Sequence, residues 1–414
     1  MQKHPARQVV GFLGCGVGAG YGRRVSEDKA SRSSGRLRVA VIFGGRSAEH
    51  EISVLSARFV LESLDAERYE PVLIGIDKNG HWLLQERALL LEGARDPRLV
   101  ALDAQQPNVV LPPHPGSELV TTSGGGVTAA GDVTAAGDAA GLAIDVAFPV
   151  LHGPMGEDGT VQGLLELAGV PYVGSGVLGS AVGMDKDVMK RLLGAAGLPI
   201  VPWLALRRPR WARARADVLA ECAALGFPLF VKPANLGSSV GVTRVKEAAL
   251  LAEAIEHAFE FDDKIVIEAG LASPREIECA VLGGDPPFAS VPGEIVVDHP
   301  DGFYSYRAKY IDESGAVTRI PADLAPDESA EVQRLALATF ATLEGEGLAR
   351  VDLFFDADRR LWVNEINTLP GFTAISMFPK LMQASGVGAT ELVTRLIEDA
   401  RARGEQRKRR RTVA

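Results

Sequence analysis

Arg350-Val351-Asp352-Leu353-Phe354-Phe355 and Leu361-Trp362-Val363-Asn364-Glu365-Ile366-Asn367 are the two runs that decide the fold. The turn 356–358 separates them, which predicts a β-hairpin. Residues two apart in a strand share a face, so Arg350 lies beside Asp352, and Glu365 beside Asn367. The hairpin then brings a guanidinium, two carboxylates and an amide oxygen to one surface. Such oxygen ligands suit Mg²⁺, which also recruits substrate phosphates; the alternative is a solvated face with a salt bridge.

A polar loop follows the second strand directly. It reads Asn367-Thr368-Leu369-Pro370-Gly371-Phe372-Thr373. Gly371 allows the backbone to approach a ligand closely, and its N–H can help to hold a developing oxyanion. Taken alone, the loop is better explained as an ordinary turn after a strand.

Earlier in the chain, an expected strand ends in Lys232 and is followed by a loop of small residues that includes Ser238 and Ser239. Small residues expose backbone N–H groups, and such concavities bind phosphate oxygens. The GxxxxGK[ST] pattern of P-loop proteins is absent. A plain turn would need neither the terminal lysine nor two serines, so we expect phosphate binding here.

Two further glycine loops precede expected helices. The first strand, 38–43, ends in two glycines before a helix where Glu49 either binds a substrate ammonium or satisfies the helix dipole. The loop 152–163 opens a second helix, whose N-terminus attracts anions such as a carboxylate. On its own, His152 is more often a packed or surface histidine.

Together these segments resemble the D-alanine–D-alanine ligases of the ATP-grasp superfamily, over roughly residues 38–400. The motifs stand in the family's order: GGRSAEHE at 44–51, HGPMGEDGTVQG at 152–163, VGSGVLGSAVGMDK at 173–186, KPANLGSSVGV at 232–242, REIE at 275–278, RVD at 350–352 and NEINTLPGFT at 364–373. The resemblance implies an α/β chain (α+β ATP-grasp), with an N-terminal parallel α/β domain and a two-part clamp that closes on ATP.

We expect these boundaries: a disordered leader at 1–37, the N-terminal domain at 38–183 with a low-complexity insertion at 112–141, a central subdomain at 184–263, a C-terminal subdomain at 264–404 and a solvated basic tail at 405–414. The insertion contains a tandem hexapeptide, VTAAGD, at 127–138, and two copies cannot build a solenoid. We expect the last helix over Ala389–Arg403.

The resemblance also implies ATP and two Mg²⁺ or Mn²⁺ ions. The residues that match the family's nucleotide site are Lys186, Lys232, Ser238, Ser239, Glu268, Ala269, Leu271, Glu276 and Lys309. Lys186 and Lys232 resemble the lysines that hold the ATP phosphates, and Lys309 the one that closes over the γ-phosphate. The strand 266–268, which ends in Glu268, and the following residues 269–271 resemble the hinge that meets adenine, and Glu276 resembles the acid that binds the ribose. The matched metal ligands are Asp352, Glu365 and Asn367.

The residues that match the amino-acid site and the catalytic set are Glu49, His152, Ser238, Tyr310, Arg350, Gly371, Ser376 and Met377. Glu49 resembles the group that binds the first alanine's ammonium, and His152 lies near its carboxylate. Arg350 and the N–H of Gly371 match the groups on the tetrahedral intermediate. Ser376, with Met377, fits the second alanine's carboxylate.

A lid is also implied. Glu49, Ser238 and Tyr310 resemble a hydrogen-bonded triad that pins a loop near 298–318 over the site. Relatives that use D-lactate as the second substrate carry Phe in the lid where this chain has Tyr310. Tyr310 therefore favours D-alanine.

The composition of the chain limits which partners and which cellular compartment we expect. The 414 residues carry a net charge of −9, which argues against broad nucleic-acid binding. No apolar stretch reaches the roughly 20 residues that span a bilayer, so we expect no membrane segment. Three scattered cysteines without a CxxC pair favour a reducing cytoplasm, and Cys279 is expected to be a buried thiol. The family resemblance implies a homodimer with D-alanine and ATP as its ligands.

Other functions stay open at this point. The chain can instead be a D-alanine–D-lactate ligase or another ATP-grasp carboxylate–amine ligase, because a fold alone does not define a substrate. A catalytically silent ATP-binding regulator is a further alternative, although such a protein would be expected to have lost Arg350 or a metal ligand.

Overall fold

The computed structural model describes residues 35–92, 101–122, 141–297 and 316–409. Contacts divide the chain into residues 1–36 and a second unit, Leu37–Ala414, to which the helices and strands of the described ranges belong. Most of the expected leader lies outside the described residues, and Leu37 already begins the first strand. Within the described ranges, no helix combines the length and the apolar character needed to cross a membrane.

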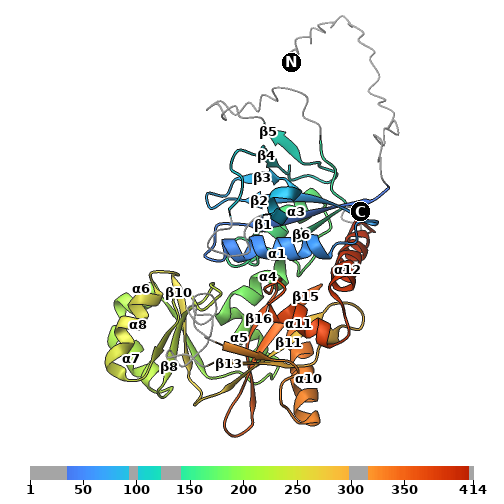
Figure 1. Ribbon diagram of the computed structural model, residues 1–414. Helices are drawn as coiled ribbons and strands as arrows, with labels where there is room; N and C mark the ends of the chain where they lie inside the picture. The colour runs from blue at the N-terminus through green and yellow to red at the C-terminus, as the bar shows by residue number, and fades with distance from the viewer. Residues whose placement is uncertain (1–34, 93–100, 123–140, 298–315, 410–414) are drawn as a thin grey trace, which may run out of the picture. The chain divides into compact units, whose positions relative to one another are not determined.

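The first sheet has six strands in the order β5-β4-β3-β2-β1-β6. Its strands are β1 (Leu37–Gly44), β2 (Tyr69–Ile76), β3 (Trp82–Gln85), β4 (Asn108–Val110), β5 (Val120–Thr122) and β6 (Val146–Pro149). Strand β1 is parallel to β2 and to β6, and its central residues are fully buried, as in sheets covered on both faces. The helices of this region are α1 (His50–Ser63), α2 (Arg87–Glu92) and α3 (Thr160–Ala168), and α1 packs on β1 (Figure 1).

Two expectations for this region need correction. The sheet is mixed rather than parallel, because β3, β4 and β5 run antiparallel to their neighbours. The expected insertion at 112–141 is not irregular throughout, because β5 lies inside it and Leu119 forms an antiparallel bridge with Leu142. The hexapeptide repeat itself lies outside the described residues.

The second sheet has four strands in the order β7-β10-β8-β9, and all neighbours are antiparallel. Its strands are β7 (Trp203–Arg207), β8 (Leu229–Pro233), β9 (Thr243–Val245) and β10 (Lys264–Ala269). The accompanying helices are α6 (Arg208–Arg213), α7 (Arg215–Ala223), η2 (Ala248–Leu250) and α8 (Leu251–Ala258). Leu229 and Val231 are buried in the core of this sheet, while Phe230 and Lys232 alternate with them and point to the other face.

The boundary expected at residue 264 was wrong. Strand β10 was assigned to the C-terminal subdomain, but it pairs with β7 and β8 and lies between them in the second sheet. Helix α4 (Val177–Met184) leads into α5 (Lys186–Ala195), which was assigned to the central subdomain, yet Met189 and Leu193 of α5 are buried with residues of the third sheet. An apolar strand or helix does not reveal in its own sequence which sheet it joins.

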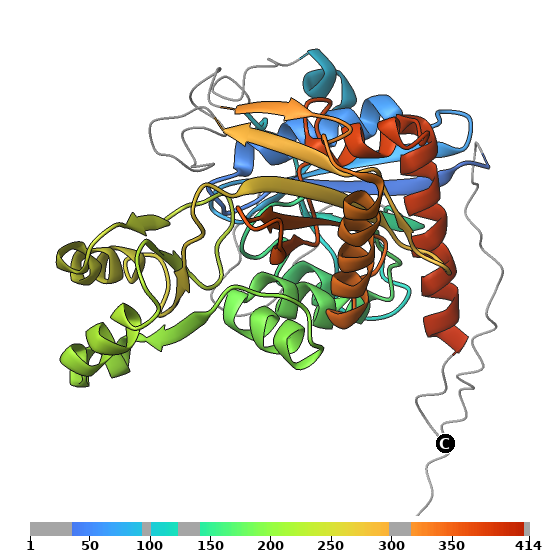
Figure 2. The same ribbon diagram turned by 90° about the horizontal axis from the view of Figure 1, so that it is seen from below.

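The third sheet is antiparallel, in the order β14-β13-β11-β15-β16, with β12 paired to β11. Its strands are β11 (Arg275–Leu282), β12 (Phe288–Ala289), β13 (Gly293–Val297), β14 (Ala316–Arg319), β15 (Leu348–Phe355) and β16 (Leu361–Asn367). Helix α10 (Pro326–Thr342) packs on one face (Figures 1 and 2). On that face Cys279 and Val351 are buried, and strand alternation sends Glu278, Arg350 and Asp352 to the opposite face.

The chain closes with α11 (Met377–Ala384) and α12 (Ala389–Arg409). Helix α12 was expected to end at Arg403 and to be followed by a solvated basic tail. The structure extends the helix to Arg409, and Arg407 forms ion pairs with Glu346 and Glu166. The prediction of a solvated tail was therefore wrong for Arg407, because acidic partners distant in sequence cannot be read from the basic run itself.

Candidate functional site

The hairpin prediction is confirmed. Strands β15 and β16 pair Arg350 with Asn367 and Asp352 with Glu365, so the four polar side chains share one face. The guanidinium of Arg350 donates from Nε to Asp352 Oδ1 and from Nη2 to Oδ2, both at 2.7 Å. Asn367 Nδ2 donates to Asp352 Oδ2 at 3.0 Å. Arg350 therefore reaches the candidate metal ligands and aligns one of them.

A third carboxylate, which sequence reasoning did not single out, lies in the same row. Glu278 of β11 stands opposite Asp352, so the row across three strands reads Glu278, Asp352, Glu365. Glu278 Oε2 lies 3.0 Å from Arg350 Nε. Burial opposes the charge on Arg350, but Asp352 and Glu278 outweigh it and raise the pKa of the guanidinium. The available signal was the REIE motif, where Glu278 follows Glu276 on the same strand face.

The residues expected to bind metal fit a nucleotide-associated Mg²⁺. Asp352 and Glu365 face each other across the two strands, and Asn367 contacts Asp352. Within the described ranges, no group of three or more His, Cys, Asp or Glu side chains is arranged to hold a metal by itself. Mg²⁺ characteristically takes one or two protein carboxylates and completes its shell with phosphate oxygens and water. A site of this composition would therefore depend on a bound polyphosphate.

A cavity of about 400 Å³ lies between residues of the second and third sheets. Its lining includes ten of the predicted residues: Lys186, Lys232, Ser238, Ser239, Glu268, Ala269, Leu271, Glu276, Asp352 and Glu365. Strict alternation would turn Asn364 away from it, yet Asn364 also lines the cavity. The pairing shifts after Asp352, because Leu353 stands opposite Val363, and this bulge leaves Asn364 without an opposite residue.

A buried carboxylate lies between two lysines at the inner wall. Glu268 Oε2 lies 2.7 Å from Lys232 Nζ, and its Oε1 lies 3.2 Å from Lys190 Nζ. Burial disfavours the carboxylate, but the two ammonium groups hold the pKa of Glu268 at about 2. Burial likewise opposes the charge on Lys232, but Glu268 raises the pKa of that lysine. Sequence reasoning missed Lys190, although it lies four residues after Lys186 on the same face of α5.

Lys186 is held at the start of α5. The side chain of Asp185 caps this helix by accepting from the backbone of Asp187 and Val188, each at 3.1 Å. Lys186 Nζ donates to the carbonyl of Leu236 at 2.7 Å and lies 3.4 Å from Glu365 Oε2. This ammonium therefore joins the loop after β8 to the candidate metal ligands.

The loop after β8 carries two serines in left-handed backbone conformations, Ser238 at φ 51° and Ser239 at φ 59°. Such strain clusters at ligand clamps and is tolerated where surrounding contacts hold it. Ser238 Oγ donates to Glu49 Oε1, which brings the N-terminal region to the loop. Two members of the predicted triad are thus in contact. The third, Tyr310, lies outside the described residues, as does Lys309.

His152 is buried and connects α1 to the loop 367–373, which we call the Pro-Gly loop. Its Nδ1 lies 3.0 Å from the carbonyl oxygen of Leu369, and its Nε2 lies 3.0 Å from Ser56 Oγ. Burial lowers the pKa of His152, which favours the neutral ring. A carbonyl only accepts, so Nδ1 carries the proton and Nε2 accepts from Ser56. The hydroxyl of Ser56 also accepts from Phe372 N at 3.3 Å.

The loop that holds Gly371 is fastened to the start of α11. A side chain on Gly371 would place its Cβ 3.0 Å from Ser376 Oγ, so glycine allows the loop to approach Ser376 closely without displacing that hydroxyl. Ser376 Oγ accepts from Thr373 N at 3.0 Å and contacts Thr373 Oγ1 at 2.8 Å. The side chain of Met377 is buried in the core, so only its backbone N–H is suited to bind a carboxylate.

Glu157 is a further group that sequence reasoning did not assign, although it lies inside the glycine motif 152–163. It accepts from Gly153 N at 2.9 Å. Burial and the neighbouring charge of Glu49 raise the pKa of Glu157 to about 8. A carboxylate close to a buried carboxyl group disfavours ionisation of that buried group.

Comparisons with known proteins agree with this geometry. Residues 38–175 match the family model described as D-ala D-ala ligase N-terminus, and residues 192–398 match D-ala D-ala ligase C-terminus. The chain is 49% identical to D-alanine--D-alanine ligase A of Chromobacterium violaceum, over 89% of this chain and 96% of the relative.

Two solved structures are also similar. One is the D-alanine-D-alanine ligase from Coxiella burnetii, with TM-score 0.75 and 35% identity, covering 90% of this chain and 96% of that one. The other is the VanG D-Ala:D-Ser ligase from Enterococcus faecalis, with TM-score 0.74 and 31% identity, covering 88% and 99% of the two chains.

Proposed function

The chain belongs to the D-alanine–D-alanine ligase family, and we propose that it joins two D-alanine molecules to D-alanyl-D-alanine with conversion of ATP to ADP and phosphate, for peptidoglycan precursor synthesis. One observation carries the proposal. Asp352, which Arg350 aligns, and Glu365 line the same cavity as Lys186 and Lys232. Carboxylates for a divalent metal and lysines for phosphates thus meet around one cavity, which is the arrangement that phosphoryl transfer requires.

Carboxylate and amine do not condense in water unaided, so the first D-alanine must be activated. Transfer of the γ-phosphoryl group to its carboxylate gives an acyl phosphate with a good leaving group. Asp352, Glu365 and Asn367 would hold Mg²⁺ or Mn²⁺, which neutralises phosphate charge during this transfer. Lys186 and Lys232 bind the phosphates, and Glu268 keeps Lys232 protonated. Lys309 completes the lysine set from the segment 298–315.

The second step forms the peptide bond. The neutral amine of the second D-alanine attacks the acyl phosphate, and phosphate leaves as the tetrahedral intermediate collapses. Arg350 and the N–H of Gly371 stabilise the oxyanion; donors of this kind are each worth about 10²–10³ in rate. Glu49 binds the first ammonium, His152 orients the loop that bears Gly371, and the backbone at Ser376 and Met377 receives the second carboxylate. Glu49, Ser238 and Tyr310 together pin the lid that excludes water.

We further propose that the chain acts in the cytoplasm, where ATP is supplied, and as a homodimer, as the family resemblance implies. Light scattering on the purified protein tests the dimer, and a monomeric mass would contradict it.

The proposed function is tested by incubating the purified full chain with ATP and D-alanine, with and without Mg²⁺. We expect one ADP and one phosphate for each D-alanyl-D-alanine, and no product without the divalent ion. D-Lactate and D-serine as competing second substrates distinguish the neighbouring specificities, and Tyr310→Phe is expected to raise the yield of D-alanyl-D-lactate. An ATP-binding protein that forms no dipeptide would contradict the proposal.

A further inference from the structure

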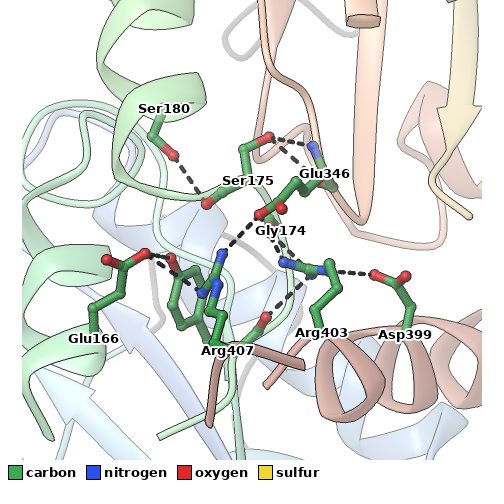
Figure 3. A network of polar contacts seen from close by, with 9 residues as sticks. Glu166, Gly174, Ser175, Ser180, Glu346, Asp399, Arg403 and Arg407 are labelled. Carbon is green, nitrogen blue, oxygen red and sulfur yellow. Dashed lines mark hydrogen bonds and ion pairs between the residues drawn. The ribbon is translucent and has the colours of Figure 1, made fainter. Parts of the chain in front are cut away.

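The last helix carries two arginines whose polar contacts reach far back in the sequence (Figure 3). Arg403 Nη2 donates to the carbonyl oxygens of Gly174 at 3.1 Å and Tyr172 at 3.3 Å, and its Nη1 donates to Glu346 Oε2 at 2.9 Å. Arg403 Nε donates to Asp399 Oδ2 at 2.8 Å. One planar guanidinium with a fixed fork of donors therefore joins three separate segments.

Arg407 lies one turn further along α12 and strengthens the same junction. It donates from Nη2 to Glu346 Oε2 at 2.9 Å, and its Nη1 lies 3.4 Å from Glu166 Oε1. Its guanidinium carbon stands 5.2 Å from the centre of the Tyr172 ring, and the Tyr172 hydroxyl donates to Glu166 at 2.7 Å. Burial opposes the charge, but Tyr172, together with Glu346 and Glu166, raises the pKa of Arg407.

The two segments held by these arginines also contact each other directly. Ser175 Oγ accepts from Glu346 N at 3.2 Å. Gly347 has φ 69°, and a Cβ there would lie 2.9 Å from Gly174 N, so the two backbones meet where only glycine fits. The segment 172–176 precedes α4, and the turn 343–347 precedes β15. This network, which we call the C-terminal clamp, consists of Arg403, Arg407, Glu346, Gly174, Ser175 and Tyr172.

Both segments lead directly to groups that act in the proposed reaction. Arg350 follows Gly347 by only three residues along the chain and β15. Leu369 lies in the loop just before Gly371, and a Cβ on Gly174 would lie 3.0 Å from its side chain. The carbonyl oxygen of Leu369 accepts a hydrogen bond from His152. The nucleotide lysines do not depend on this junction, since Lys186 is fixed by the α5 cap and Lys232 by Glu268.

We propose that Arg403 and Arg407 are positioning residues. They hold Arg350 and the Pro-Gly loop in the relative positions needed to stabilise the tetrahedral intermediate. The inference rests on the proposed function. It goes beyond the family match, because the matched region ends at residue 398, before both arginines. The reaction thus depends on a part of the chain that contacts no substrate.

A displacement of about 1 Å can cost up to roughly 100-fold in rate even when the mutated residue is remote. We expect Arg403→Met to lower kcat about tenfold and to leave the KM for ATP within about twofold. Arg403→Lys should restore little, because a single ammonium cannot span the same acceptors. Arg407→Met should have a smaller effect, since Arg403 keeps its bond to Glu346. Arg395→Met is the control, because Arg395 pairs, among the described residues, with the exposed Glu391 on the same helix and not with the segments of the clamp.

Rates are measured per folded protein, with melting temperature recorded for each variant. Hydrogen exchange supplies a second readout that does not need activity. Arg403→Met should raise exchange at 344–350 and 368–371 but not at 229–245, so the clamp is testable even if the wild-type chain fails as a ligase. If Arg403→Met is insoluble, Arg407→Met combined with Glu346→Gln takes its place, and the two changes should be non-additive. A folded variant with unchanged kcat, or equal losses of kcat and ATP affinity, would overturn the inference.

Discussion

Asp352 accepts two parallel hydrogen bonds from Arg350, each 2.7 Å long, from a residue two positions earlier on the same strand. This fork orients the carboxylate expected to bind metal and, at the same time, fixes the guanidinium expected to meet the oxyanion. Because Glu278 lies 3.0 Å from the same guanidinium, Arg350 is balanced between two carboxylates. Its planar geometry is therefore as important as its charge.

Arg350→Lys keeps the charge and loses the fork. We expect kcat to fall by about 10²–10³, the usual loss for one oxyanion donor, with a smaller change in the KM for ATP. Steady-state kinetics with ATP and D-alanine measure both constants. Arg360→Lys, at the exposed turn of the same hairpin, is the matched control. A kcat within twofold of the wild type would remove Arg350 from the chemical step.

Glu365→Gln removes one expected metal ligand without touching the fork. We expect the Mg²⁺ concentration for half-maximal activity to rise at least roughly tenfold, because two carboxylates and an amide leave few protein oxygens to spare. Asp358→Asn, a carboxylate exposed at the hairpin turn, should leave the Mg²⁺ requirement unchanged. An unaltered Mg²⁺ titration for Glu365→Gln would place the metal elsewhere.

Lys190→Met leaves Glu268 with a single cationic partner, and Glu268 is 3% exposed. Removal of one partner from a buried ion pair typically costs about 3 kcal/mol or more of unfolding free energy. We also expect the KM for ATP to rise, because Glu268 then neutralises Lys232 alone. Chemical denaturation and ATP titration measure the two effects, with the exposed Lys246→Met as control. If Lys190→Met lowered neither the unfolding free energy nor the affinity for ATP, the coupling of Lys190 to Lys232 through Glu268 would be contradicted.

Glu157 predicts a pH dependence of stability. Its pKa is about 8 in the folded chain and about 4.3 in an unfolded one. The group therefore favours the folded state fully below about pH 4.3, and this stabilisation is lost as the pH rises to about 8. Glu157→Gln removes the dependence, so its unfolding free energy, measured by urea denaturation, should fall less than that of the wild type between pH 5 and pH 8, by an amount on the order of a few kcal/mol. If the unfolding free energies of the two proteins changed equally with pH, a raised pKa of Glu157 in the folded chain would be ruled out.

Much of the fold was predictable because local patterns determine it. The hairpin and the first buried strand follow from apolar periodicity and turn residues, and they were placed close to their observed bounds. The partner sheet of β10 was not predictable, since an apolar strand pairs wherever a tertiary edge is offered. The extension of α12 to Arg409 depends on Glu346 and Glu166, which lie far away in sequence.

In the candidate site, too, the features that local sequence determines were predictable, and those that depend on tertiary contacts were not. Motif residues such as Lys232 and Asp352 were predictable because their chemistry is visible in the chain. Asn364 was not, because it reaches the cavity through a bulge that breaks strict alternation. Glu278 and Lys190 carried a signal in their spacing from Glu276 and Lys186, but only the pairing of strands and the buried ion pair with Glu268 reveal their partners.

The central claim is tested most directly by following the γ-phosphate and the dipeptide in one reaction. The full chain is incubated with Mg²⁺, unlabelled ATP and D-alanine that carries ¹⁸O in its carboxylate. Activation through an acyl phosphate predicts transfer of one ¹⁸O to the released phosphate for each dipeptide formed. Phosphate without ¹⁸O, or ATP consumption without D-alanyl-D-alanine, would contradict the account.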